Sequence, residues 1–146
     1  MKKLLLLLLA LSFTAFLQAQ SPNSTLPPEA VIASFSKTFP NVKNAIWEKH
    51  GKKYDVYFIA DSVDHTATYK DTGAQILHRF PVALILLPKE VIAGVEREFS
   101  TTNIGSAEKI EEDGKIQYQL SLPSGESFVK VIMSETGVLV KTLSEG

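Results

Sequence analysis

The chain carries one twelve-residue pattern twice, and this repeat limits the folds that it can adopt. The first copy begins at Pro28 and the second at Pro88, and a proline, a Val-Ile-Ala triplet and a closing Phe stand at matching places in both. In the first copy Val31, Phe35 and Phe39 recur every four residues, which places them on one face of a helix. Proline near the first helical position loses no hydrogen bond. The repeat therefore predicts two similar amphipathic helices.

After each helix the apolar period changes to two, which is typical of strands. The matches between the two copies also continue: Tyr118, Leu120 and Leu122 fall on Tyr54, Val56 and Phe58, and Glu135-Thr136-Gly137 falls on the hairpin signal Asp71-Thr72-Gly73. We therefore expect two tandem α-β-β-β-β units, at residues 28–81 and 82–146, within one domain at 28–146. They should form an α+β fold in which an antiparallel sheet of about eight strands has both helices packed on one face.

Between the two units, residues 81–87 form an uninterrupted apolar run bounded by prolines. It is too short to span a membrane. We expect it to be a buried connector or strand.

The N-terminus has the pattern of a secretory signal peptide. Two lysines precede an apolar core that is free of charge, and small residues follow it. We place this signal at residues 1–19, with cleavage after Ala19, followed by a flexible polar leader at 20–27. The protein is then expected to be periplasmic or secreted, with no stable membrane insertion after cleavage.

Charge and composition exclude several classes of function. Without residues 1–19 the chain has 13 basic and 16 acidic residues, a formal charge of −3, which argues against nucleic acid as a partner. The absence of cysteine excludes disulfides, so stability must come from a packed core. The chain also lacks a Gly-x-Ser-x-Gly elbow, a Ser-x-x-Lys motif and a glycine-rich phosphate loop. We therefore predict that the protein is not an enzyme and needs no cofactor.

A resemblance to a known family follows from the apolar and turn positions. The chain is similar to the secreted bacterial PepSY-like family, whose fold is akin to that of the β-lactamase inhibitor protein, over residues 27–143. The positions that carry the likeness are Leu26–Val31, Phe35, Phe39-Pro40, Trp47, Tyr54–Phe58, Ala67–Tyr69, Asp71–Gly73 and, at the start of the second copy, Leu87–Val91. The resemblance implies a helix-backed curved sheet whose uncovered face could hold another protein. The second copy departs from the pattern, since Ile110 stands at the position expected to correspond to Trp47.

The predicted binding surface is the sheet face away from the helices. If Tyr54, Val56 and Phe58 face the helices, their neighbours in the strand face away and meet residues of the next strand. An aromatic anchor among short hydroxyl side chains suits protein binding. The candidate binding residues are Tyr57, Asp55, Thr66, Thr68 and Trp47; Trp47 could belong to either face, and a core position is also open to it.

The alternative is a small-ligand or metal carrier that uses the region of His65, His78 and Arg79. The two histidines stand on strands that flank the Asp71-Thr72-Gly73 turn, so they are expected to be near each other. A zinc site needs three or four ligands, and no third residue stands at a fixed spacing. Ordinary strand histidines are the simpler interpretation, and the partner of the binding module remains an unknown protein.

Overall fold

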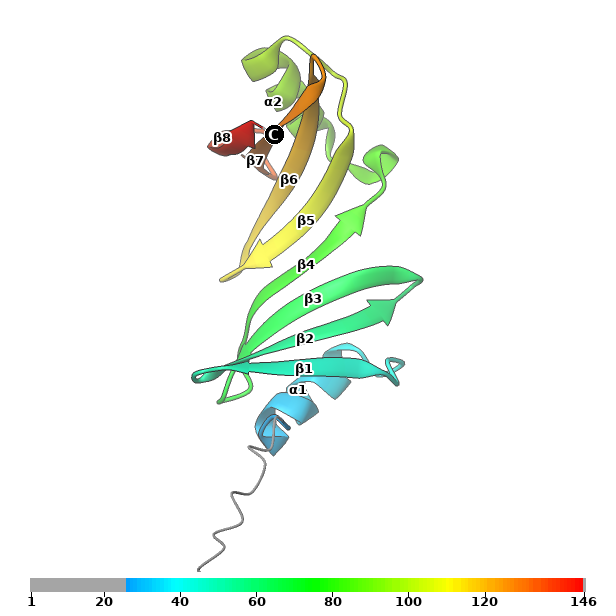
Figure 1. Cartoon of the computed structure of the whole chain (residues 1–146), viewed down its shortest axis with the longest axis vertical. Helices are drawn as coiled ribbons and strands as arrows, with labels where there is room; N and C mark the ends of the chain where they lie inside the picture. Colours follow the sequence, from blue (N-terminus) through cyan, green and yellow to red (C-terminus); the bar gives the residue numbers. More distant parts are fainter. Residues whose placement is uncertain (1–25, 146) are drawn as a thin grey trace, which may run out of the picture.

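The computed structural model describes residues 26–145 as two helices and a single antiparallel sheet of eight strands. The strands lie side by side in the order in which they occur in the chain, β1 to β8 (Figure 1). This confirms the α+β fold class and the expected number of strands. The predicted signal peptide and most of the leader lie outside the described residues. The elements are α1 (Glu29–Thr38), β1 (Ala45–His50), β2 (Lys53–Ala60), β3 (Val63–Lys70), β4 (Gln75–Val82), the 3₁₀ turn η1 (Leu84–Leu86), α2 (Lys89–Phe99), β5 (Ser106–Glu112), β6 (Lys115–Ser124), β7 (Ser127–Ser134) and β8 (Leu139–Glu145).

Both helices begin directly after a proline, as the repeat predicts. The carbonyls of Pro28 and Pro88 accept the first helical hydrogen bonds, so the missing proline N–H costs nothing. Helix α1 ends before Phe39-Pro40, where the ring of Pro40 prevents another turn. Helix α2 ends at Phe99, and the next residue, Ser100, caps it: Ser100 adopts a left-handed conformation with φ of 54° and donates its N–H to the carbonyl of Glu96.

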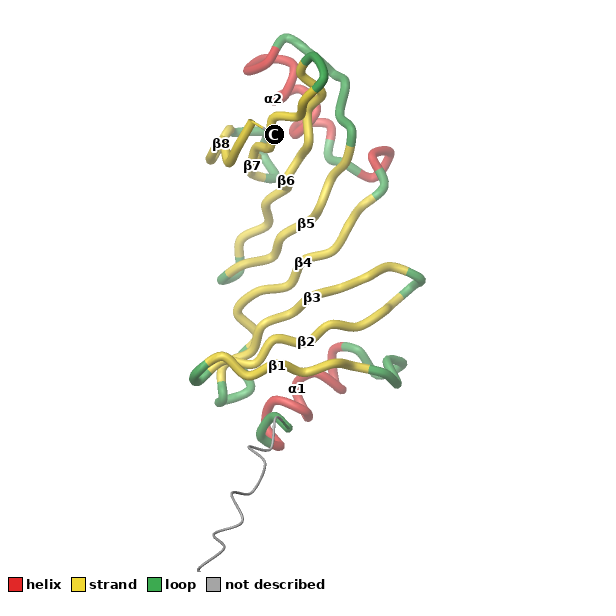
Figure 2. Tube along the Cα trace, in the orientation of Figure 1, coloured by secondary structure: helices red, strands yellow, loops and turns green. Residues whose placement is uncertain are grey.

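The two helices cover the same face of the sheet, which we call the helix face. The strand pairing shows that this face continues from the first half into the second. Val56 lies opposite Ala67 and Ala67 lies opposite His78. His78 in turn lies opposite Glu111 of β5. Helix α1 lies beside β1–β3 and α2 lies at the other end, beside β6–β8 (Figure 1). In Figure 2 the strands within β1–β4 and within β5–β8 follow one another through short turns.

Each helix has its own hydrophobic core. Phe35 of α1 is the centre of the first core, with its ring 5.0 Å from that of Phe58 and 5.2 Å from that of Trp47. Val91 and Val95 of α2 are fully buried in the second core, against Leu120 and other apolar side chains of β6–β8. The two cores are separate clusters, so the molecule has a first half (residues 29–82) and a second half (residues 89–145) that meet at the β4–β5 pair. We call this pair the seam.

The tight hairpin of each half packs directly on its helix through a glycine. A Cβ on Gly73 would lie 2.6 Å from the carbonyl oxygen of Ala30, and one on Gly137 would overlap the carbonyl oxygen of Glu90. Both glycines also have positive φ, 90° and 79°, which residues with a side chain adopt only with strain. Thus the Thr-Gly motif that the two copies share both makes the turn and lets the helix approach the sheet.

The expectation for residues 81–87 is wrong in its main part. Pro81 and Val82 end β4, but Leu84, Ile85 and Leu86 form an exposed 3₁₀ turn, with exposed fractions of 40%, 89% and 71%. Because each half has its own core, the link between them has no third core to enter. On either side of this turn, Leu87 is buried in the second core and Val82, at the end of β4, packs against it.

We expect Gly137→Ala to lower the free energy of unfolding by about 3 kcal/mol or more, because it adds backbone strain and a steric overlap with α2. Gly114→Ala is the matched control: Gly114 has nearly the same φ, 78°, but nothing within 4 Å of its added Cβ. It should lose only about 1–2 kcal/mol. Urea denaturation of both variants checks this, and equal losses would contradict the proposed contact.

Candidate functional site

Four of the five candidate binding residues share the sheet face opposite the helices. Asp55 pairs with Thr68 and Tyr57 with Thr66 in the β2–β3 ladder, and all four side chains alternate with buried residues of the first core. We call this the outer face; in the first half it is formed by Ile46, Glu48, Asp55, Tyr57, Ile59, Asp64, Thr66, Thr68, Leu77 and Arg79, and in the second half by Glu108, Ile110, Gln117, Gln119 and Ser121.

Trp47 does not belong to the outer face. It lies opposite Val56 on the helix face and packs its ring 5.2 Å from Phe35 and 6.2 Å from Tyr69. Its match to Ile110 is also wrong, because Ile110 lies on the outer face. In the second half Ala107, paired with Leu120, takes the place of Trp47. The β5–β6 hairpin is longer than β1–β2, and this shifts the alignment of the copies.

Three of the candidates already have polar partners within the chain. The hydroxyl of Thr68 donates to Asp55 at 2.6 Å, and Thr68 is buried with an exposed fraction of 8%. The hydroxyl of Tyr57 donates to Glu48 at 3.2 Å. Burial and the charge of Glu48 raise the pKa of Tyr57, so the phenol stays protonated and keeps donating. Thr68 and Asp55 therefore support the face, whereas Tyr57 and Thr66 remain more accessible.

An apolar groove opens on the outer face beside Tyr57. It has a volume of about 400 Å³ and is lined by Asn44, Ile46, Tyr57, Phe58, Ile59, Asp64, His65 and Thr66. Ile46 and Ile59 are 69% and 63% exposed, so aliphatic side chains face solvent on both sides of the Tyr57 ring. Sequence reasoning missed both isoleucines as site residues. Ile59 stands two positions after Tyr57, and Ile46 lies directly opposite Tyr57 in the β1–β2 ladder.

The middle of the outer face is closed by an ion pair across the seam. Arg79 of β4 donates from Nε to Glu108 of β5 at 3.0 Å, and its Nη2 also contacts the same carboxylate. These hydrogen bonds from Arg79 to Glu108 raise the pKa of the guanidinium. Beside them Ile110 is 7% exposed without any helix covering it. Arg79, named in the carrier alternative, is thus paired across the seam.

Polar side chains take the places of Asp55 and Tyr57 in the second half of the outer face, although the exposed Phe128 also lies on this face. Gln119 and Ser121 take the places of Asp55 and Tyr57 in the β6–β7 ladder, and Ile132 and Lys130 the places of Thr68 and Thr66. The apolar groove beside Tyr57 is lined by residues of the first half.

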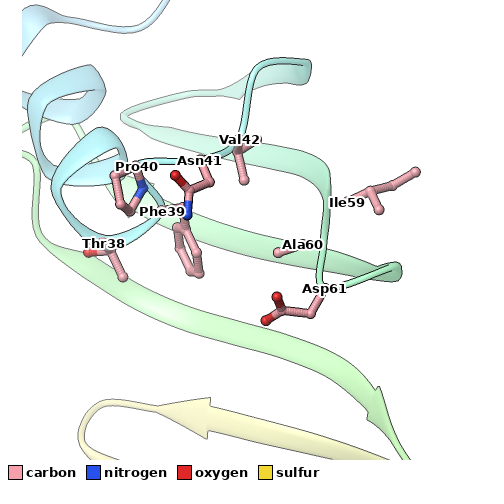
Figure 3. A pocket seen from close by; sticks show the side chains of 8 residues that line it. All are labelled: Thr38, Phe39, Pro40, Asn41, Val42, Ile59, Ala60 and Asp61. Atoms are coloured by element: carbon pink, nitrogen blue, oxygen red, sulfur yellow. The ribbon is translucent and has the colours of Figure 1, made fainter.

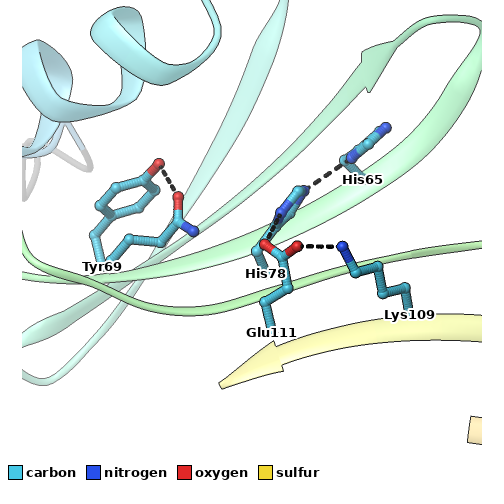
Figure 4. Close-up of polar contacts among 6 residues, drawn as sticks. His65, Tyr69, His78, Lys109 and Glu111 are labelled. Carbon is cyan, nitrogen blue, oxygen red and sulfur yellow. Dashed lines mark hydrogen bonds and ion pairs between the residues drawn. The ribbon is translucent and has the colours of Figure 1, made fainter. Parts of the chain in front are cut away.

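On the helix face, His65 and His78 form a polar row with residues of the second half (Figure 4). Nδ1 of His65 lies 2.9 Å from Nε2 of His78, and Nδ1 of His78 lies 3.2 Å from Glu111. Lys109 contacts the other oxygen of Glu111 at 2.7 Å. The row thus crosses from β3 to β5, and the prediction that the two histidines are neighbours is confirmed by the distance.

Aromatic rings surround the histidine pair. The two imidazole rings are stacked, with centroids 5.2 Å apart, and Phe58 and Phe80 lie on either side at 5.2 and 4.7 Å from His65. His78 is 7% exposed. Burial, together with charge on His78, lowers the pKa of His65 and outweighs the carbonyl of Ala60 and the carboxylates of Asp61 and Asp64, which favour its cation.

The surroundings favour the charged form of Glu111, whereas they favour the neutral form of His65. Burial opposes its ionisation, but hydrogen bonds from Lys109 and His78 outweigh burial and lower the pKa of its carboxyl. Glu111 is therefore an anion at neutral pH and orients the imidazole of His78.

The histidine pair does not have the arrangement of a metal centre. Among residues 26–145, no three His, Asp or Glu side chains are placed to hold one ion. The reason is geometric: one nitrogen of His78 faces His65 and the other faces Glu111, so the groups form a line and do not converge. The metal form of the carrier alternative thus has two ligands where zinc needs at least three.

A smaller hollow of about 230 Å³ lies between the end of α1 and the β2–β3 turn (Figure 3). Phe39 and Asp61 point into it, whereas Ile59 points away toward the outer face. The Phe39 ring is also 5.2 Å from that of His78, so this side chain touches both the hollow and the polar row.

Comparison with solved structures identifies the fold of this chain. The chain matches no protein-family model and no curated protein. Among solved structures, a BLIP-like protein from Bacteroides fragilis NCTC 9343 aligns with a TM-score of 0.66 and 21% identity, over 81% of this chain and 86% of that one. This chain has the BLIP-like fold.

Two further structures support the same fold. A DUF2874 family protein from Bacteroides uniformis ATCC 8492 aligns with a TM-score of 0.69 and 12% identity, over 81% of this chain and 89% of that one. A protein from Bacteroides eggerthii DSM 20697, provisionally described as periplasmic, aligns with a TM-score of 0.68 and 12% identity, over 81% and 88%. The resemblance to the PepSY-like family remains a prediction.

Of the described helices, neither has the length and apolar character needed to cross a membrane.

We expect the melting temperature to fall by roughly 2–5 °C between about pH 7.5 and 5.5. The folded pKa of His65 is below its ordinary value of 6.5, so the unfolded chain binds more protons as the pH falls through this window, and stability is lost. Glu111 adds a further loss only below its ordinary value of 4.5.

Scanning calorimetry of His65→Gln checks this prediction, because the melting temperature of the variant should change less with pH in that window. His50→Gln is the control, since the His50 side chain is 59% exposed and lies outside the row. An unchanged slope in His65→Gln would contradict the assignment.

Proposed function

We propose that the protein is a secreted or periplasmic, non-enzymatic module that binds another protein through the outer face of its first half. The observation that carries the proposal is the apolar groove with Ile46, Tyr57 and Ile59 at its surface. An aromatic side chain flanked by exposed aliphatic ones is typical of the residues that dominate binding energy at protein interfaces. Within residues 26–145, no layer of the chain covers this face.

Charge around the groove indicates the chemistry of the partner. Asp64 lines the groove, and Glu48 lies beside Tyr57 and holds its hydroxyl. We therefore assign as occupant a protein loop that places an apolar side chain in the groove and a lysine or arginine next to it. Tyr57 supplies the anchor, and Thr66 the adjacent hydroxyl.

The proposed location and the proposed non-enzymatic role are supported by different observations. The N-terminal sequence has the signal pattern, and one neighbour of the same fold is provisionally described as periplasmic. The non-enzymatic interpretation is supported by the absence of nucleophile motifs in the sequence and by the BLIP-like neighbour.

Site-specific photo-cross-linking in the producing cells tests this surface. A benzophenone side chain replaces Tyr57 in one variant and Ser121, its counterpart in the second half, in the control. We expect a cross-linked peptide from another protein at position 57 and none at 121, with an apolar residue beside Lys or Arg in that peptide. Equal cross-linking at both positions, cross-links only to a second copy of this chain, or no cross-link would contradict the proposal.

Affinity for the captured partner gives the energetic test. Tyr57→Ala should weaken binding roughly tenfold or more, the range of an interface anchor, whereas Ser121→Ala should change it less than about twofold. Titration calorimetry measures both, and unchanged melting temperatures show that the loss belongs to the interface. Equal affinity of Tyr57→Ala and the unsubstituted protein would exclude the groove.

A further inference from the structure

The first strands of the two halves, β1 and β5, differ in what lies beside them. In the second half β4 pairs along one edge of β5, and this pair is the seam. In the first half β1 is the last strand of the sheet, and among residues 26–145 no strand pairs with its other edge (Figure 1). The side chains of Glu48, Lys49 and His50 are exposed there. The seam therefore provides a template for a strand beside β1.

Strand β1 repeats the Glu-Lys pair of β5. Ala107 takes the place of Trp47, and the same two residues follow in each strand, Glu48-Lys49 in β1 and Glu108-Lys109 in β5. The glutamate lies on the outer face and the lysine on the helix face in both strands. Strand β1 thus has, at a free edge, the two side chains that β5 uses at the seam.

At the seam both side chains contact β4. Arg79 donates from Nε to Glu108 at 3.0 Å, and Nζ of Lys109 lies 5.8 Å from the centre of the Phe80 ring. The equivalent carboxylate of β1 is open to a similar partner, because the Glu48 side chain is 53% exposed. The hydroxyl of Tyr57 bonds to its Oε2, and Oε1 faces no donor among the described residues. A basic side chain of another strand can bind there as Arg79 binds at the seam.

The backbone of β1 also points toward this edge. The carbonyl of Lys52 accepts from the N–H of Asp71 at 3.0 Å, which continues the β2–β3 ladder. Bonding alternates along a strand, so Asp55, three residues on, faces β1, and its partner Glu48 faces back to β2. The N–H and C=O of Lys49 therefore face the free edge, as do those of every second residue before it.

The opposite edge of the sheet does not fit β1 of a second copy. Strand β8 takes the place of β4 in the second half, but its register with β7 shifts at two points, whereas β1 and β2 pair without interruption. Such bulges are a common protection of an edge strand. Strand β8 also has Ser144 opposite Lys130, where β4 has Arg79 opposite Thr66. A strand from another protein is therefore the better occupant.

We propose that a strand of the partner protein adds to the free edge of β1 as β4 adds to β5, antiparallel to β1 and as a ninth strand of the sheet. The backbone groups at the edge supply the ladder, and the side chains select the sequence. In the order of the seam, the partner strand has an arginine or lysine that reaches Glu48, followed by an aromatic residue beside Lys49.

The end of the added strand reaches the groove. Its residue opposite Trp47 is small, because Trp47 takes the place of Ala107 and leaves less room on the helix face. Its next residue lies opposite Ile46 on the outer face, and Ile46 lines the groove beside Tyr57, so an apolar side chain fits there. This last contact, unlike the strand addition, rests on the proposed function.

A peptide taken from the seam is the probe. It has the sequence of residues 76–83 with Val82→Ala and Ala83→Leu, so it carries Arg79 and Phe80 in the required order. Fluorescence anisotropy of the labelled peptide measures its affinity for the mature protein.

Hydrogen exchange followed by NMR locates the bound peptide. With the peptide in excess, the amides of Trp47 and Lys49 should exchange at least about tenfold more slowly. The amide of Glu48, which already faces β2, should change less than about twofold. Protection elsewhere in the chain without protection at Trp47 and Lys49, or no binding of the peptide, would overturn the strand addition.

A matched pair of variants at one position tests the backbone contact. Lys49→Pro removes an N–H that faces the free edge and should abolish peptide binding, while proline is tolerated on the open side of an edge strand. Lys49→Ala removes the same side chain but keeps the N–H, so it should weaken binding less than about fivefold. Equal binding to both variants would contradict the proposal, as would a dimer of this chain that Lys49→Pro dissociates.

A charge exchange gives the same answer if Lys49→Pro fails to fold. Arg79→Glu in the peptide should weaken binding at least about tenfold, and Glu48→Lys in the protein should restore it for that peptide. The absence of any restoration would exclude Glu48 as the partner of the basic residue.

The strand addition and the groove fail separately. Slow exchange at Trp47 and Lys49 without a cross-link at position 57 would overturn the groove alone. A cross-linked partner that binds Lys49→Pro as well as Lys49→Ala would overturn the strand addition alone.

Discussion

The contact between a hairpin glycine and its helix determines how the rest of the molecule is arranged. In each half a turn from the far end of the unit packs on the first turn of the helix, with Gly73 against Ala30 and Gly137 against Glu90. This closes the unit on itself, since the first and last elements touch. It also places both helices on the same face of one sheet, and in the part of the chain that the structure describes the other face has no covering layer.

The uncovered face is stable because its own side chains close its centre. Arg79 and Glu108 pair across the seam, Thr68 donates to Asp55, and Ile110, opposite Arg79 in the ladder, is buried. Apolar side chains that such contacts do not cover remain at the end of the first half, around Tyr57. The second half has Ser121 at the corresponding position, so duplication gave both halves one scaffold but not one surface.

Much of the fold could be predicted because a repeat of apolar and turn positions restricts the fold strongly. Proline before each helix, alternation in the strands and Thr-Gly at the hairpins all have a local physical cause. The assignment of Asp55, Tyr57, Thr66 and Thr68 to one face followed from the alternation within β2 and β3.

The features that the sequence did not predict depend on the lengths of the hairpins and on contacts between elements. The longer β5–β6 hairpin displaced the match of Trp47 from Ala107 to Ile110. The exposure of Leu84–Leu86 follows from having two cores and no third, which composition does not reveal. The groove needed Ile46 from β1 beside Ile59 from β2, and this proximity depends on the register of the pair.

The histidine row shows how a duplicated fold acquires a property that neither copy has alone. His65 and His78 come from the first half and Glu111 and Lys109 from the second, and they meet because β4 and β5 pair at the seam. In the second half the ladder position of His65 is occupied by Val129, opposite Leu122, where an imidazole would enter the apolar core. Titratable groups are thus tolerated on the helix face where neither helix covers it. The polar row therefore lies where β4 of the first half pairs with β5 of the second.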